Sequence, residues 1–188
     1  RKESEMETLT EIRFDTLPTE YEVFLSLAEK TLHLPEHAAG LFVIALRIYA
    51  VDQDLGRKMI AFLRHEDSLS ETEEKKLLSE PLRKASYIPL SYFKGASAEN
   101  GYTPAEPYTV TVKDNRLKSR KWNEKTLYLG CGGSGTYRPI TLFKVKYRKL
   151  KNRHFEDDAW FIKDYASLML PINLPRQKEL KEPSKEMA

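Results

Sequence analysis

The first half of the chain repeats its apolar positions every three to four residues, which is the spacing of amphipathic helices. The run Ala38–Leu46 is apolar nearly all round, so its helix is expected at the centre of a helical lobe that spans residues 14–84. Pro81 is expected to end the last helix, since proline disrupts a helix interior. Four helices are predicted, each opened by a residue that suits a helix start: Pro18, Pro35, Asp52 and Ser70.

The second half alternates apolar and polar residues, as strands do, after a connector at residues 86–107. This connector is rich in aromatics, unlike a flexible Gly/Ser linker, so we expect it to be ordered and anchored to both parts of the chain. Asn100-Gly101 predicts a turn within it. Four strands are predicted, at about residues 108–112, 126–131, 140–148 and 159–162. The third would place Lys144, Lys146 and Arg148 on one face.

Together these patterns predict an α+β protein: an N-terminal helical lobe packed on a small, mostly antiparallel C-terminal β-sheet or barrel. Residues 1–13 are expected to form a flexible N-terminal segment and residues 175–188 a flexible charged tail. Residues 85–174, the connector and β lobe, are expected to form one cooperative unit with the helical lobe. Because the chain begins at Arg1 rather than Met, we expect it to be a fragment.

The composition excludes several classes of protein. The chain has 188 residues, of which 40% are hydrophobic, enough for a buried core. Its longest apolar run, Ala38–Leu46, is far shorter than the roughly 20 residues that span a bilayer, so no membrane association is expected. Cys131 is the single cysteine, which excludes an internal disulfide and a multi-cysteine metal site and favours a cytoplasmic location.

Charge is divided unevenly along the chain. Residues 1–80 hold 10 Lys and Arg against 17 Asp and Glu, whereas residues 113–153 hold 13 against 2. This basic block has Trp122 and Tyr128 available for stacking, as proteins that hold single-stranded nucleic acid do. On sequence grounds, a solvated sheet face, or a dock for the acidic helical lobe of the same chain, is favoured over nucleic acid. The basic residues assigned to it are Lys118, Arg120, Lys121, Lys144, Lys146 and Arg148.

The segment Gly130–Gly135 matches the G-x-G-x-x-G pattern of phosphate-binding loops. A dinucleotide site also needs a helix to begin there, but Arg138-Pro139 and a strand pattern follow instead. A hairpin loop is therefore favoured. The alternative is an anion held by Arg138 and the backbone of Gly132 and Gly133.

Three other groups resemble reactive or metal-binding motifs. His33 and His37 match H-x-x-E-H, but Pro35 between them prevents the continuous helix that a zinc site would need. Cys131 has no local base and is expected to be a buried small hydrophobe. Asp157-Asp158 and Asp164 are expected to form a turn and a cap. We therefore expect no catalytic residues, no metal and no cofactor.

Several segments together resemble a bacterial family catalogued only as a domain of unknown function. They are Leu17–Tyr21, Asp54–Gly56, Tyr87–Ala96, Asn100–Val110 and Gly132–Ile140, and the resemblance covers about residues 14–170. Members of that family have a G-G-x-x-S-P-R-P-x-x-L-R segment. This chain keeps Gly132, Gly133, Arg138, Pro139 and Leu142 but has Thr136, Tyr137 and Phe143 where the family has Ser, Pro and Arg. Its segment 144–156 is also longer and more basic. The resemblance implies a bacterial cytoplasmic protein and supplies no activity.

The sequence thus favours an uncharacterised, non-catalytic binding or scaffolding module with an unknown protein partner. The alternative is a module that binds nucleic acid or another anion through residues 113–153, and a hydrolase is a third possibility. The candidate ligand-binding residues are Arg138, Lys144, Lys146, Arg148, Gly132 and Gly133.

Overall fold

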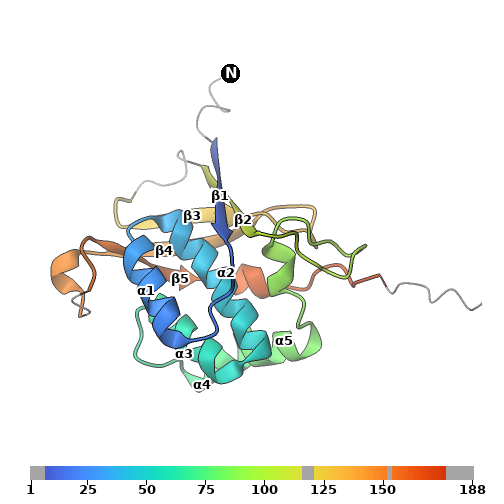
Figure 1. Ribbon diagram of the computed structural model, residues 1–188, viewed down its shortest axis with the longest axis horizontal. Coiled ribbons are helices and arrows are strands. Elements are labelled where there is room, and N and C mark those ends of the chain that lie inside the picture. The colour runs from blue at the N-terminus through green and yellow to red at the C-terminus, as the bar shows by residue number, and fades with distance from the viewer. Residues whose placement is uncertain (1–6, 116–120, 152–153, 177–188) are drawn as a thin grey trace, which may run out of the picture.

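The structure, a computed structural model, describes residues 7–115, 121–151 and 154–176. Helices gather on one side of a five-stranded antiparallel sheet (Figure 1). The α-helices are α1 (Tyr21–Thr31), α2 (Pro35–Val51), α3 (Gln53–Leu63), α4 (Glu71–Glu73) and α5 (Glu80–Lys84). The strands are β1 (Glu7–Phe14), β2 (Tyr108–Asn115), β3 (Glu124–Leu129), β4 (Arg138–Val145) and β5 (Ala159–Asp164). The predicted α+β class is confirmed, and the sheet is open rather than a barrel.

The strands follow one another in sequence order across the sheet, from β1 at one edge to β5 at the other. β1 pairs with β2 along its whole length, from Glu7 opposite Asn115 to Phe14 opposite Tyr108. The expectation that residues 1–13 are a flexible segment is therefore wrong for residues 7–13. Only Ile12 and Phe14 of this strand are buried, so its apolar alternation is too short to read from the sequence.

Helix α2 lies at the centre of the hydrophobic core, as its all-round apolar surface predicts. Eleven of its residues are buried, and it packs against the sheet and against α3. The predicted caps are confirmed: Asp52 accepts a hydrogen bond from the Leu55 N–H, and Ser70 accepts one from the Glu73 N–H. A single buried cluster includes residues from the helices and from all five strands.

The prediction that Pro81 ends the last helix is wrong. A π-helical turn, Glu74–Ser79, joins α4 to α5, and the helix continues to Lys84. In a regular helix the proline ring would collide with the carbonyl of Leu77, and the wider turn lies directly before it.

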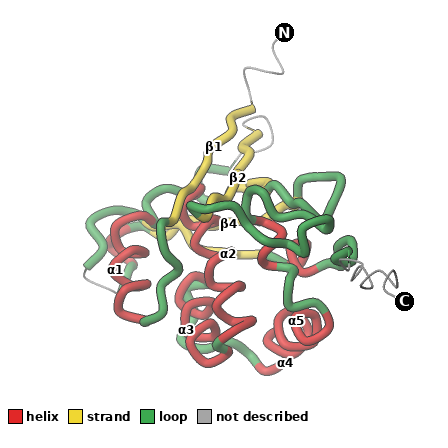
Figure 2. The backbone as a smooth tube through the Cα atoms, turned by 45° about the vertical axis from the view of Figure 1, so that its right-hand side comes forward, coloured by secondary structure: helices red, strands yellow, loops and turns green. Residues whose placement is uncertain are grey.

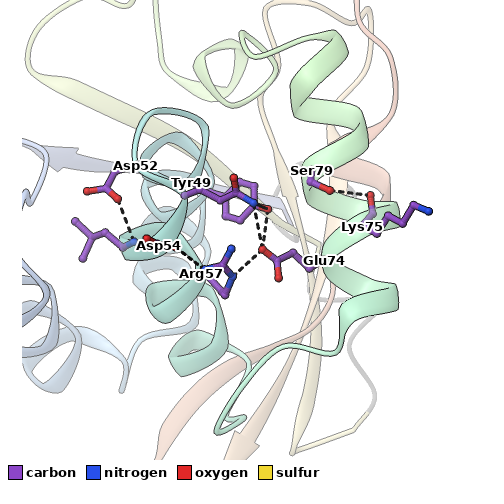
Figure 3. Close-up of polar contacts among 9 residues, drawn as sticks. Tyr49, Asp52, Asp54, Arg57, Glu74, Lys75 and Ser79 are labelled. Atoms are coloured by element: carbon purple, nitrogen blue, oxygen red, sulfur yellow. Dashed lines mark hydrogen bonds and ion pairs between the residues drawn. The ribbon is translucent and has the colours of Figure 1, made fainter.

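A network of polar contacts connects this π-turn to α2 and α3 (Figure 3). Glu74 Oε1 accepts hydrogen bonds from Tyr49 Oη at 3.0 Å and from Arg57 Nε at 2.7 Å. Burial, and then the hydrogen bond to Glu74, raise the pKa of Tyr49 to about 12. The tyrosine therefore remains a neutral donor at any physiological pH.

The connector is ordered, as its aromatic content predicts. Tyr92, Phe93 and Tyr102 are buried, and Tyr102 stacks on Tyr87 with ring centroids 5.2 Å apart. The predicted Asn100-Gly101 turn is present. The Asn100 side chain accepts from the N–H groups of Ser97 and Thr103 and donates to two carbonyls, while Gly101 has φ +64°. Apart from the 3-10 helix Pro89–Tyr92, this segment forms loops beside the sheet (Figure 2).

The C-terminal segment remains attached to the connector up to the last described residue. The Arg176 N–H donates to the Ala98 carbonyl at 2.8 Å, so the expectation of a flexible tail from residue 175 onward is wrong for Arg176. Residues 177–188 lie outside the described part of the chain.

Gly56 gives a direct test of how tightly α2 and α3 pack. A Cβ at this position would lie 2.2 Å from the Tyr49 Cα atom, whereas a Cβ at Gly135 would meet nothing within 4 Å. Glycine to alanine normally stabilises a helix by about 1 kcal/mol. We expect Gly56→Ala instead to destabilise by about 1–3 kcal/mol, because the backbones must separate. Urea denaturation measures this. Gly135→Ala, the control, should change little, and a stabilised Gly56→Ala variant would contradict the packing.

Candidate functional site

Cationic and aromatic side chains meet at the end of the sheet where β4 leaves it. Trp122, Lys144, Lys146, Arg148 and Lys149, hereafter the basic end, line an open hollow of about 390 Å³ together with Asn123 and Val145. In Figure 1 the Tyr147–Lys149 turn lies at the left, opposite the connector and the C-terminal segment.

Backbone pairing at Asn123, the residue just before β3, brings Trp122 to this position. The Lys144 N–H donates to the Asn123 carbonyl at 2.9 Å, which continues the β3–β4 hairpin and places Trp122 beside the end of β4. Lys144 also lies opposite Trp160 of β5. The local pairing therefore assembles two indoles around one lysine.

The strand is shorter than the sequence predicts. β4 starts at Arg138 and ends at Val145, so Lys146 and Arg148 are not on a strand face with Lys144. Lys146 instead precedes a 3-10 turn, whose Tyr147 N–H donates to Asp158 Oδ1 at 2.8 Å. All three basic residues nevertheless line the same hollow.

Lys144 and Lys146 of the basic end interact with aromatic rings rather than with carboxylates in the described part of the chain. Lys146 Nζ lies 4.9 Å and Lys144 Nζ 5.6 Å from the centroid of Trp122, which is 62% exposed, and Lys144 is also 5.5 Å from that of Trp160. Within the described ranges, no ion pair joins Lys144, Lys146 or Arg148 to a carboxylate. Within the described part of the chain, no carboxylate therefore neutralises these three charges.

Two acidic residues of the helical part, Glu73 and Glu74, form ion pairs with arginines of that same part. Arg64 pairs with Glu73 at 2.8 Å, and Arg57 pairs with Glu74. The interpretation in which the basic block docks onto the acidic helical lobe therefore has no ion pair to support it among the residues that the structure describes.

Among the described residues, Tyr128 and Lys121 of the predicted basic block do not line this hollow. Tyr128 faces Lys113, whose Nζ lies 6.0 Å from its ring centroid and 4.4 Å from that of Tyr137. Lys121 is exposed beside Trp122 in sequence, and Lys118 and Arg120 lie outside the described residues.

Arg138 lies at the other end of β4, six residues from Lys144 and so about 20 Å away. Its guanidinium donates to the carbonyls of Leu170 at 2.7 Å and Pro171 at 2.8 Å. The predicted ligand residues therefore do not form one site, and Arg138 fixes the C-terminal segment against the sheet.

Gly132 and Gly133 make close packing contacts near Arg138. The Gly132 N–H donates to the Ser91 carbonyl, and a Cβ there would lie 1.9 Å from the Ala96 oxygen. A Cβ at Gly133 would lie 2.7 Å from the Tyr102 hydroxyl. Strand β4 follows the loop, which confirms that it is a hairpin loop without a helix at its end.

The remaining motif residues have structural positions. Pro35 begins α2 and thus separates His33 from His37, as predicted. Cys131 is half-buried with its Sγ 3.4 Å from Ser91 Oγ, so it is less buried than expected. Asp157 and Asp164 accept hydrogen bonds from nearby N–H groups. Over the described ranges no group of three or more potential ligands is arranged to hold a metal ion.

Sequence analysis missed Trp160, which is almost fully buried beneath Lys144, and Lys149. The pairing of Lys144 with Trp160 depends on strand register across the 13 residues between β4 and β5, and no local pattern encodes it. Lys149 lies within the basic sequence block, but it follows the predicted strand whose face carries Lys144, Lys146 and Arg148.

The chain belongs to a family described as a domain of unknown function, DUF6935, whose family model matches residues 16–176. This agrees with the resemblance noted in the sequence. No curated protein and no solved structure matches the chain. In the described part of the chain, no helix has both the length and the apolar character needed to cross a bilayer.

Replacing Arg138 and Arg148 separately tests their different roles. We expect Arg138→Met to lower the free energy of unfolding by about 2 kcal/mol, since it leaves the Leu170 and Pro171 carbonyls without a charged donor. Arg148→Met, at an exposed position without such bonds, should change it by less than about 0.5 kcal/mol. Chemical denaturation of both variants measures the difference. Equal stability of the two would contradict the structural role of Arg138.

Proposed function

We propose that this protein is a non-catalytic binding module that holds single-stranded nucleic acid at its basic end. The observation that carries the proposal is the exposed indole of Trp122 beside the ammonium groups of Lys144 and Lys146, which have no ion pair in the described ranges. An indole offers a flat surface to a base, and the lysines offer charge to the adjoining phosphates.

The side chains that line the hollow favour binding over catalysis. They supply cations, an amide and an indole, which suit phosphates and bases. Hydrolysis would require a positioned nucleophile or a paired acid and base. The hydrolase interpretation therefore has less support than the binding one.

An acidic protein partner is the competing occupant. It would use the lysines, as nucleic acid would, but has no general need for a stacking surface at Trp122. Nucleic acid is preferred for this reason, and the proposal includes the cytoplasmic location expected from the sequence.

The double variant Lys144→Ala, Lys146→Ala tests the proposed surface. Fluorescence anisotropy with a labelled oligothymidylate should show weaker binding. The slope of log K against log salt should become shallower by about 1.4, because about 0.7 is lost for each single-strand phosphate contact. The matched control is Lys75→Ala, Lys76→Ala, which removes the same charge from the helical side of the molecule.

Three outcomes would contradict the proposal. These are no binding at low salt, equal weakening of binding by the two double variants, and an abasic strand of the same length that binds as tightly as the oligothymidylate. The last result would show that charge alone is recognised.

A further inference from the structure

A second hollow lies on the helix-facing side of the sheet, at the N-terminus of α2. It has a volume of about 700 Å³ and is separate from the basic end, since the two share no lining residue. We call it the α2 hollow, and it is lined by Thr8, Thr10, Leu34, Glu36, His37, Asp114 and Lys125.

Asp114 is the unusual member of this lining. It is only 4% exposed, and its Oδ2 forms an ion pair with Lys125 Nζ at 2.8 Å. Its other oxygen, Oδ1, is buried without a hydrogen-bond partner. A buried carboxylate oxygen requires a donor, so Asp114 has an unused capacity to accept a hydrogen bond.

The N-terminus of α2 offers the opposite chemistry. Its first helical hydrogen bond runs from the Ala38 N–H to the Leu34 carbonyl, and no side chain caps it. The N–H groups of Glu36 and His37 precede that bond, and the dipole of a 17-residue helix favours negative charge there. The Lys125 ammonium, which carries three donors, adds a full positive charge to the same lining.

His37 adds no positive charge near neutral pH. Burial lowers its pKa, against the opposing effect of Glu36, while nearby His33 lowers it further. The charged groups of the lining are thus the carboxylates of Asp114 and Glu36 and the ammonium of Lys125. Acceptors, such as Asp114 Oδ1, and donors, such as the Lys125 ammonium, thus line the same hollow. A purely anionic ligand would leave the acceptors unmatched, and a purely cationic ligand would leave the donors unmatched.

We propose that the α2 hollow binds a free α-amino acid in its zwitterionic form. Its ammonium group would donate to Asp114, and its carboxylate would accept from Lys125 and from the N–H groups at the start of α2. An α-amino acid holds these two groups on one carbon, which matches the direct contact between Asp114 and Lys125. This site is independent of the proposed nucleic-acid surface.

Nuclear magnetic resonance titration of the full chain tests the proposal. The probes are the common α-amino acids, added in pools at millimolar concentration. At least one should shift the backbone amides of Glu36, His37, Asp114 and Lys125 in a saturable way. Its N-acetyl and amide derivatives, which lack the ammonium or the carboxylate charge, should each bind at least about tenfold more weakly.

Variants then separate the α2 hollow from the basic end. Asp114→Asn and Lys125→Met should each weaken binding by at least about tenfold, whereas the control Lys163→Met and the double variant Lys144→Ala, Lys146→Ala should not. If Asp114→Asn fails to fold, the two derivatives decide the question on the unaltered chain. The proposal is overturned if no amino acid gives saturable shifts, if the N-acetyl derivative binds equally well, or if folded Asp114→Asn binds normally.

Discussion

The burial of α2 against the sheet is the interaction on which the rest of the structure depends. This helix is apolar nearly all round and contacts every strand, while α1 and α3 cover its other sides. Each fully buried Leu, Ile or Phe contributes about 1.5–3 kcal/mol. Because α2 packs on one face of the sheet, it does not cover the two ends of the sheet, which lie near Arg138 and Lys144 of β4.

Those two ends are used in different ways. At one end the connector, the loop Gly130–Gly135 and the C-terminal segment contact one another through Arg138, Tyr92 and backbone hydrogen bonds. At the other end Lys144 and Lys146 surround Trp122 without carboxylate partners in the described ranges. At the first end, Arg138 and Tyr92 donate hydrogen bonds to carbonyls of the same chain. At the second, the lysine ammonium groups have no carboxylate partner in the described ranges, and this contrast favours a binding role for the basic end.

Much of the fold follows from local signals. Pro35, the apolar run of α2 and the caps at Asp52 and Ser70 are readable because each acts on neighbouring residues. Strand β1 was missed because Thr8 and Thr10 occupy positions on its inward face, which hides the alternation. The π-turn before Pro81 was missed because the sequence does not show that packing holds the helix together beyond a proline.

The candidate site was only partly predictable, for a related reason. Alternation of charge identified Lys144 and Lys146. An arginine that donates to carbonyls 32 and 33 residues away, as Arg138 does, looks in sequence like one that faces a ligand. The buried Asp114–Lys125 pair likewise depends on the pairing of β2 with β3. Long-range register, rather than composition, decides which polar residues remain available.

The emission of Trp122 during titration with single-stranded DNA tests the central claim most directly. The chain has two tryptophans, so Trp160→Phe leaves Trp122 as the only indole and preserves most of the volume beneath Lys144. If bases stack on Trp122, its fluorescence should be quenched to saturation by oligothymidylate and recover when salt is added. Unchanged emission at a strand concentration that saturates anisotropy would contradict the account, because the nucleic acid would then be bound elsewhere.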